Sequence, residues 1–274
     1  MNDQSEATRG AHASLEQINR QALDAARAGN GHDTHPVEMF CHGQTNEFIP
    51  VLSHELRNSL SAIRSAAQIL RIETSVGPAT VDARLLIERQ VGQMMRLVED
   101  LLDMSRVRSG QLRLNYERVD VCAVAAHAAQ TVAFAMRERH HRMTTSFPDT
   151  PVWINADPTR LEQVLVNLLL NAAKFTDEGG SVNLSVEREE AEVRVRIRDT
   201  GIGIPPDVLP HVFDLFVQAD PSSQRADAGL GIGLALVRDL VERHGGLVTA
   251  ASGGLGHGSE FTIRLPMYAE QSVR

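Results

Sequence analysis

The chain has 274 residues, 42% of them hydrophobic, and carries 27 Lys and Arg against 35 Asp and Glu, a formal net charge of −8. This length allows one large domain or two ordinary ones, and the acidic balance argues against general binding to nucleic acid or an anionic membrane, which need a positive field. The two cysteines, Cys41 and Cys122, are far apart in the chain, which indicates a reducing compartment. The sequence shows no long apolar run and no secretion signal, so we expect a cytoplasmic location without membrane insertion.

Residues 1–44 are expected to form an N-terminal tail and linker with at most one short helix. Leu15, Ile18 and Leu23 could form one thin helical stripe, and Gly29–Pro36 is typical of a linker. The segment contains too little apolar material for a domain.

Residues 45–110 carry a helical period. Apolar residues recur at spacings of three and four over 48–72 and again over 81–107, after a break at Val76-Gly77-Pro78. Two amphipathic helices joined by a short turn predict an antiparallel hairpin. Because a lone hairpin cannot cover its apolar stripe, we expect a homodimer in which two hairpins form a four-helix bundle.

Residues 111–267 show a mixed pattern, followed by a C-terminal tail at 268–274. Asp157-Pro158 predicts a helix start, with an aspartate cap and proline at the first helical position. The pattern predicts helices over 119–139, 159–175 and up to about 244, and strands over 141–147, 152–156, 182–186, 193–198, 247–252 and 260–265. The fold class is therefore α plus α/β: a helical-hairpin dimerisation domain followed by a two-layer α/β sandwich.

The first motif with chemical potential is His54-Glu55-Leu56-Arg57-Asn58 on the first hairpin helix. Its positions i, i+3 and i+4, which are His54, Arg57 and Asn58, share a helix face, and Glu55 lies beside the histidine. An exposed neutral imidazole is a nucleophile, and an adjacent carboxylate can take its proton. Taken alone, the motif fits an ordinary surface histidine with a salt-bridging glutamate better.

The second motif places Asn167, Asn171 and Lys174 at i, i+4 and i+7 on one side of an otherwise apolar helix. Unpaired amides in a core are costly, so these groups should face something polar. An amide oxygen is a hard ligand for Mg²⁺, and an ammonium group attracts phosphate. An internal amide network that caps nearby loops is the alternative.

The third motif is Asp199-x-Gly201-x-Gly203, directly after a predicted strand. A carboxylate at the end of a strand can accept a hydrogen bond from an exocyclic amine. The two glycines would let the backbone approach a flat ring.

The fourth motif is Gly229-x-Gly231-x-Gly233, immediately before a helix. Backbone N–H groups and a helix N-terminus receive phosphate in this arrangement, although a simple turn also fits. The preceding segment 218–228 is small, polar and typical of a lid or a disordered loop, with Phe213 and Phe216 placed to anchor one end. Arg225 could reach a terminal phosphate or be an ordinary solvated arginine.

Taken in order and spacing, these motifs and Phe213-x-x-Phe216 closely resemble the sensor histidine kinases over about residues 46 to 266. The C-terminal part resembles the GHKL-type ATP-binding domain. The resemblance implies ATP-dependent autophosphorylation at His54, with Glu55 as the general base. It also implies phosphoryl transfer to an aspartate of a response regulator, with Asn58 positioning water in a reverse, phosphatase reaction.

For the nucleotide site, the resemblance implies ATP and Mg²⁺ as cofactors. The metal ligand would be Asn171, supported by Asn167, while Lys174 would hold phosphate and Asp199 would recognise the adenine amino group. The glycines at 229, 231 and 233 would close the lid onto the triphosphate. Positioning and charge neutralisation would supply most of the acceleration.

Two positions depart from the family pattern, and two alternative functions remain. Ser59 stands where many relatives have proline, and Ala228 replaces the first of a glycine pair. No sensor portion is recognisable, so we expect the signal to enter through the N-terminal segment or from a separate upstream protein. The alternatives are a phosphotransfer or scaffold hairpin with a regulatory nucleotide-binding domain and no autokinase activity, and a related ATPase or serine kinase, which leaves the histidine hairpin unexplained.

Overall fold

The computed structural model describes residues 45–72, 77–217 and 231–268, without the side chains of residues 45–55, 72, 78 and 79. The predicted N-terminal tail and linker lie outside the described residues, as do Arg225 and Gly229. No helix in the described ranges combines the length and apolar character that a membrane span requires.

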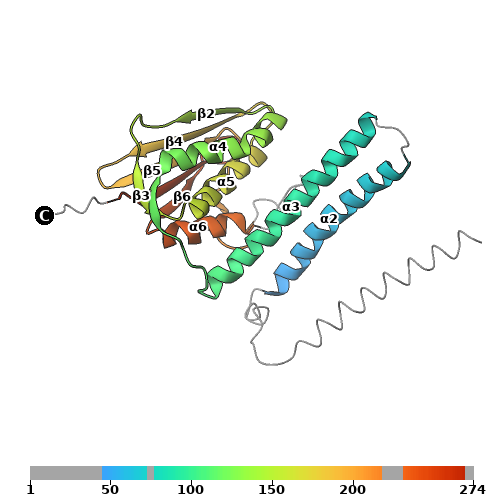
Figure 1. Cartoon of the computed structure of the whole chain (residues 1–274), viewed down its shortest axis with the longest axis horizontal. Helices are drawn as coiled ribbons and strands as arrows, with labels where there is room; N and C mark the ends of the chain where they lie inside the picture. Colours follow the sequence, from blue (N-terminus) through green and yellow to red (C-terminus); the bar gives the residue numbers. More distant parts are fainter. Residues whose placement is uncertain (1–44, 73–76, 218–230, 269–274) are drawn as a thin grey trace, which may run out of the picture. The chain divides into compact units, whose positions relative to one another are not determined.

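The predicted hairpin is confirmed as two contacting helices, α2 (Thr45–Ile72) and α3 (Pro78–Arg108) (Figure 1). The second helix begins earlier than predicted, at Pro78, because the preceding turn caps it. The backbone N–H of Gly77 donates to Thr80 Oγ1 (2.9 Å), and the Thr80 hydroxyl donates to the Gly77 carbonyl (2.7 Å). Proline suits the first helical position because its missing N–H has no helical partner there.

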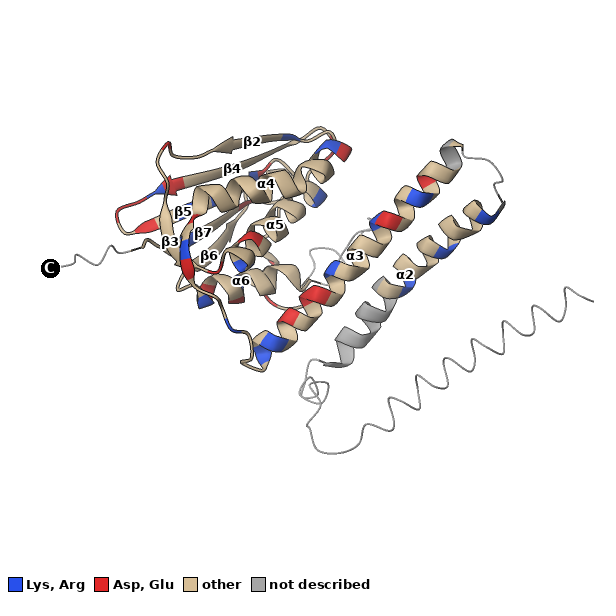
Figure 2. Ribbon diagram, in the orientation of Figure 1, with Lys and Arg blue, Asp and Glu red and all other residues tan. Residues whose placement is uncertain are grey.

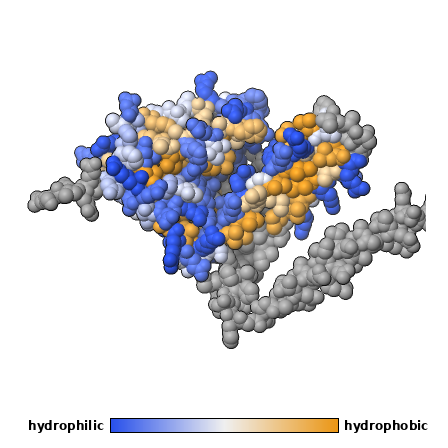
Figure 3. Space-filling view, viewed as in Figure 1, coloured by the Kyte–Doolittle hydropathy of each residue, from blue (hydrophilic) through white to orange (hydrophobic). Residues whose placement is uncertain are grey.

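The surface of the hairpin is divided between charged and apolar residues. Figure 2 shows charged residues distributed along both helices, and Figure 3 shows apolar side chains running along them on the face in view. On α3, Val91, Met95, Val98 and Leu102 are all exposed and recur at spacings of four, three and four. This spacing is the heptad pattern of helices that pack against other helices.

The rest of the described chain is the predicted α/β sandwich (Figure 1). One sheet has the order β2-β4-β5-β7-β6, in which β2 and β4 are parallel and the other neighbours are antiparallel. Its strands are β2 (Arg142–Ser146), β4 (Ser181–Arg188), β5 (Glu192–Asp199), β6 (Leu247–Ala251) and β7 (Glu260–Pro266). The remaining elements are the antiparallel pair β1 (Glu117–Asp120) and β3 (Trp153–Ala156), the short 3₁₀ helix η2 (Leu209–His211), and the helices α4 (Val121–Glu138), α5 (Pro158–Phe175) and α6 (Gly233–Arg243).

The start of α4 differs from the predicted helix at 119–139. Val119 belongs to β1, where it lies opposite Ile154 and is buried. The helix begins at Val121 because the Asp120 carboxylate caps it, accepting a hydrogen bond from the backbone N–H of Cys122 (3.1 Å). The predicted helix start was therefore wrong by two residues, because Val119 belongs to a strand.

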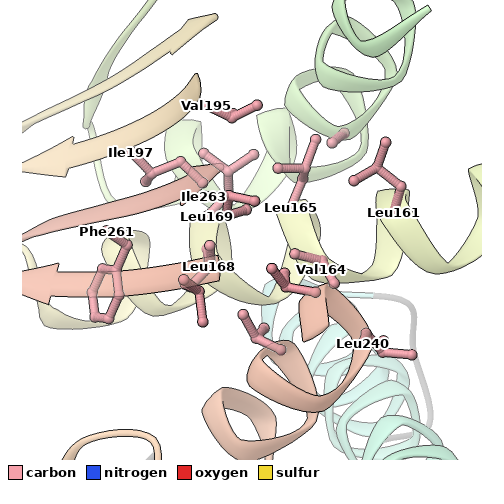
Figure 4. Close-up of a cluster of buried hydrophobic side chains, with 14 of the residues drawn as sticks. Leu161, Val164, Leu165, Leu168, Leu169, Val195, Ile197, Leu240, Phe261 and Ile263 are labelled. Carbon is pink, nitrogen blue, oxygen red and sulfur yellow. The ribbon is translucent and has the colours of Figure 1, made fainter. Parts of the chain in front are cut away.

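The helix α5 forms the centre of the hydrophobic core (Figure 4). It begins as predicted: the Asp157 carboxylate accepts hydrogen bonds from the backbone N–H groups of Thr159 and Arg160. Pro158 lies in the first turn, also as predicted. Its buried side chains pack among those of the sheet and α6. The main contributors are Leu161, Val164, Leu165, Leu168, Leu169, Ile197, Leu240 and Ile263, all 1% exposed or less. Burying each such side chain contributes about 1.5–3 kcal/mol to folding.

The hairpin and the sandwich are joined at the C-terminal part of α3, where acidic residues gather (Figure 2). The Asp103 side chain is 7% exposed and accepts hydrogen bonds from Arg160 Nη1 (2.5 Å) and Gln163 Nε2 (2.9 Å) on α5. On α6, the Arg243 guanidinium donates to the Val107 carbonyl (3.1 Å). The helix at the centre of the sandwich therefore also contacts the hairpin directly.

Candidate functional site

The polar side chains of α5 lie where the helix leaves the core. Asn167, Asn171 and Lys174 are all partly buried. The Asn167 side-chain nitrogen is buried without a hydrogen-bond partner among the described residues, and a Cβ placed on Gly233 would lie 3.9 Å from it. A buried unpaired amide costs about 1–3 kcal/mol, so this one is expected to meet a ligand. The first residue of α6 therefore lies beside the polar line of α5.

Asp199 is held rigidly at the end of β5. The residue is 4% exposed, and one carboxylate oxygen accepts from the backbone N–H groups of Gly201 (2.8 Å) and Ser259 (3.2 Å). The other oxygen accepts from the Ser259 hydroxyl (2.5 Å). Because an ionised carboxylate offers about four acceptor positions, it can still accept one more donor.

The loop after Asp199 approaches the end of α5 closely. The backbone N–H of Ile202 donates to the Phe175 carbonyl (3.0 Å), and a Cβ on Gly201 would overlap that carbonyl oxygen. A side chain at this position is therefore excluded. The third motif and the C-terminal turn of α5 are thus one connected unit.

A second glycine-rich segment, Ser252–Gly258, was missed by the sequence analysis. It packs on the Asp199 loop, with the backbone N–H of Gly256 donating to the Ile202 carbonyl (2.8 Å) and that of Gly258 to the Gly201 carbonyl (3.0 Å). A Cβ on Gly203 would overlap the Gly254 carbonyl, and Gly203 has a φ of 73°. The glycine-rich run itself was the available signal, although it also fits an ordinary turn between strands.

The described residues that flank segment 218–230 contact each other. The backbone N–H of Phe216 donates to the Gly231 carbonyl (3.0 Å), and a Cβ on Gly231 would lie 2.9 Å from Phe216 Cα. Phe216 has a φ of 67°, an uncommon conformation for a bulky residue. The ring of Phe213 packs edge-on against Phe261, with centroids 6.1 Å apart. The aromatic pair predicted to anchor this segment therefore lies at its base.

The hairpin carries the first motif on α2. The helical backbone of α2 runs through His54 and Glu55, whose side chains lie outside the described residues. Arg57 and Asn58 are exposed, whereas Ser59 is 3% exposed. A polar residue one position after an exposed asparagine is thus buried within the hairpin.

The donor set near α5 suits a hard cation that also binds a nucleotide. No group of three His, Cys, Asp or Glu side chains within the described ranges could hold a metal ion. Mg²⁺ commonly takes few protein ligands and completes its shell with phosphate oxygens and water. The amide oxygen of Asn171 and the unpaired Asn167 nitrogen fit such a shared site.

Two family models match the chain. The "His Kinase A (phospho-acceptor) domain" matches residues 44–110, and the "Histidine kinase-, DNA gyrase B-, and HSP90-like ATPase" matches residues 156–269. The chain belongs to the sensor histidine kinase family. Within this histidine kinase chain, the phosphoacceptor match covers the α2–α3 hairpin, and the ATPase match covers α5, the Asp199 loop and α6.

Similar histidine kinases extend beyond the region that this chain matches. Sensor histidine kinase TrcS of Mycobacterium tuberculosis is 38% identical over 231 residues, which cover 82% of this chain and 44% of TrcS. The structure of full-length ShkA in complex with AMPPNP is 30% identical, with a TM-score of 0.60, covering 82% of this chain and 46% of ShkA. Histidine kinase ThkA in complex with response regulator TrrA has a TM-score of 0.60 at 22% identity, covering 81% and 61%, and shows the shared fold alone. The chain spans less than half the length of TrcS.

Proposed function

We propose that this chain is the kinase core of a two-component sensor histidine kinase that autophosphorylates His54 from Mg–ATP. The observation that carries the proposal is the meeting of three motifs around one helix. The Asp199 loop contacts the end of α5 through Phe175, and the start of α6 lies beside Asn167. The same chain carries a phospho-acceptor hairpin.

The adenine end of the nucleotide would bind at Asp199. Its carboxylate retains acceptor capacity for an exocyclic amine, and its three protein donors fix its direction. Gly201 and Gly203 would hold the loop after Asp199 in place, because their missing side chains let it pack directly on Phe175 and Gly254. These contacts would orient the base and so direct the phosphates.

The triphosphate end would lie along the polar line of α5. The Lys174 ammonium would attract phosphate oxygens, and the Asn167 amide would donate to one of them. The Asn171 amide oxygen would ligate Mg²⁺, which when bound neutralises phosphate charge. The lid glycines 229, 231 and 233 and Arg225 would close on the same group, with Phe216 fixing one end of the lid.

The transfer step requires an imidazole nitrogen of His54 to attack the terminal phosphorus of ATP. A nitrogen–phosphorus bond forms, the phosphorus–oxygen bond to the leaving ADP breaks, and Glu55 takes the imidazole proton. Asn58 is exposed on the same helix and would position water for the reverse, phosphatase reaction. Most of the acceleration would come from positioning.

The partners follow from the hairpin and the family. The exposed apolar residues of α2 and α3 support a homodimer through a four-helix bundle. An aspartate of a response regulator would receive the phosphoryl group, and the fold shared with ThkA, solved with TrrA, is compatible with such a partner. A separate sensor or upstream protein would supply the signal.

Radiolabelling tests this function. The purified chain incubated with γ-labelled ATP and Mg²⁺ should acquire an acid-labile, base-stable label that His54→Gln abolishes. His127→Gln, which alters an exposed histidine on α4, is the matched control and should label normally. A label that survives His54→Gln would contradict the proposal. ATP binding without self-labelling, together with labelling of His54 by another phosphoprotein, would instead indicate a phosphotransfer hairpin.

A further inference from the structure

The C-terminal turn of α5 is held by more than its own helix. The last four carbonyls of a helix have no partner within it, so each needs another donor. In α5 all four have one, and three of the donors come from other elements. The contacts are Thr176 N to the Ala172 carbonyl (3.0 Å), His141 Nε2 to the Ala173 carbonyl (2.9 Å), Arg139 Nη1 to the Lys174 carbonyl (3.2 Å) and Ile202 N to the Phe175 carbonyl (3.0 Å).

His141 is a buried donor to this turn. The residue is 8% exposed, and its contact with the Ala173 carbonyl requires a proton on Nε2. The other ring nitrogen is buried without a partner among the described residues. An unpaired buried nitrogen costs free energy, so the ring is not explained by core packing alone.

Arg139 brings positive charge to the end of α5. Helix C-termini carry partial negative charge, which is stabilised by a nearby cation that binds the last carbonyls. At this end the charge matters further, because Lys174 would receive anionic phosphate here. The Arg139 guanidinium therefore both fixes the Lys174 backbone and offsets the negative field there.

The turn that carries these two residues is itself locked to the loop after α5. The backbone N–H of Gly179 donates to the Arg139 carbonyl (3.1 Å). His140, with a φ of 54°, lies 2.8 Å from the Glu178 carboxylate through Nδ1. The turn after α4 is thus a fixed support.

We propose that Arg139 and His141 are positioning residues for the triphosphate half of the nucleotide. They hold the turn of α5 on which Asn171 and Lys174 stand, and so direct the metal ligand and the phosphate-binding ammonium. The proposal rests on the proposed function. It makes a selective claim, because the adenine half has its own anchor in the contacts of Asp199 with Ser259 and Gly201.

The test compares disruptive and conservative variants in binding. Arg139→Met and His141→Leu should weaken Mg–AMPPNP binding about tenfold, the loss expected when a positioning hydrogen bond disappears. Adenosine affinity should change less than about twofold. Arg139→Lys and His141→Gln, which retain a donor, should recover most of the Mg–AMPPNP affinity. Arg137→Met, which alters an exposed arginine in the same turn of α4, is the matched control.

A second readout reports the turn directly. Hydrogen exchange of the amides at 172–176 should accelerate in Arg139→Met and His141→Leu, while the amides of Gly201 and Ser259, which are bonded to the Asp199 carboxylate, keep their exchange rates. If Arg139→Met does not fold, the comparison of His141→Leu with His141→Gln still tests the proposal. If His141→Leu does not fold, the comparison of Arg139→Met with Arg139→Lys does so.

Three outcomes would overturn the proposal. Unchanged Mg–AMPPNP affinity in both disruptive variants would show that the turn needs neither residue. Equal losses for adenosine and Mg–AMPPNP would show a general structural role. A wild-type chain that binds neither compound would refute the proposed function itself, and with it this inference.

Discussion

At the scale of single residues, Asp199 shows how a binding group is prepared before its ligand arrives. Three donors converge on a carboxylate that is 4% exposed, so its direction is fixed without the nucleotide. Because the carboxylate is already ordered, ligand binding loses less side-chain entropy than it would with a mobile group. If one carboxylate oxygen were replaced, some of these buried donors would lose their acceptor, and the fold would be destabilised.

We predict that Asp199→Asn lowers ATP affinity at least about tenfold and lowers the free energy of unfolding by about 1–3 kcal/mol. The new amide group would face N–H and O–H donors and could not accept the adenine amine at the same oxygen. Isothermal titration with ATP and urea denaturation measure the two effects. Asp207→Asn, an exposed acid in the following loop, should change neither. Normal ATP affinity in Asp199→Asn would remove this residue from the site.

Two residues donate to the Asp199 carboxylate, and only the one that is near Asp199 in the chain was predicted from the sequence. Gly201 follows Asp199 by two positions, so the motif itself predicts their proximity. Ser259 reaches Asp199 only because β5 and β7 pair with Arg198 opposite Glu260. A register between strands that are distant in the chain cannot be derived from local spacing. For the same reason, the sequence did not predict that the glycine-rich segment Ser252–Gly258 packs on the Asp199 loop.

At the scale of elements, periodicity predicts which segments form helices and strands better than it predicts where they begin. The apolar stripes of the hairpin and α5 are long enough to predict these helices, and the Asp157 cap also predicts where α5 begins. The apolar run that continues from Val119 predicts a helix there, whereas Val119 pairs with Ile154 of β3. Its partner lies beyond α4 in the chain, and no local pattern contains that information.

The helix α3 contains an acidic side chain with a pH-dependent effect on stability. Burial, and then the neighbouring charges of Asp103 and Glu99, raise the pKa of Asp100 to about 6. The folded chain therefore binds this proton more tightly than the unfolded chain does. Between about pH 4 and pH 6 the Asp100 contribution to stability falls as pH rises, and above pH 6 the ionised carboxylate destabilises the fold.

We predict that Asp100→Asn stabilises the chain by about 2–3 kcal/mol at pH 8 and by little at pH 4, because the amide mimics the protonated acid. Urea denaturation from pH 4 to pH 8 measures the difference. Asp82→Asn, an exposed acid on the same helix, should show no such slope. A constant difference between Asp100→Asn and the parent chain across this range would contradict the assignment.

At the scale of the whole molecule, one carboxylate joins the hairpin to the helix that carries the nucleotide residues. Arg160→Met would leave Asp103 buried with Gln163 and a more distant arginine, Arg106, at 3.7 Å. We predict a loss of about 3 kcal/mol in the free energy of unfolding, because a buried charge that loses its nearest cation is costly. In Asp103→Asn/Arg160→Met the penalty should be smaller than the sum of the single changes. Arg84→Met, which breaks an exposed ion pair on α3, should cost less than about 1 kcal/mol.

The exposed stripe of the hairpin makes a prediction about assembly. Met95 and Leu102 on α3 are 59% and 50% exposed, and Leu60 on α2 is 55% exposed. A second hairpin would cover such residues, so Met95→Glu would bury a charge at the interface. We predict that this variant dissociates at least about a hundredfold more readily while retaining wild-type ATP affinity, since the sandwich is unchanged. Sedimentation equilibrium measures the dimer, with Gln68→Glu, a charge added at an exposed polar site, as the control. An undiminished dimer in Met95→Glu would place the interface elsewhere, and the apolar stripe would then need another partner to cover it.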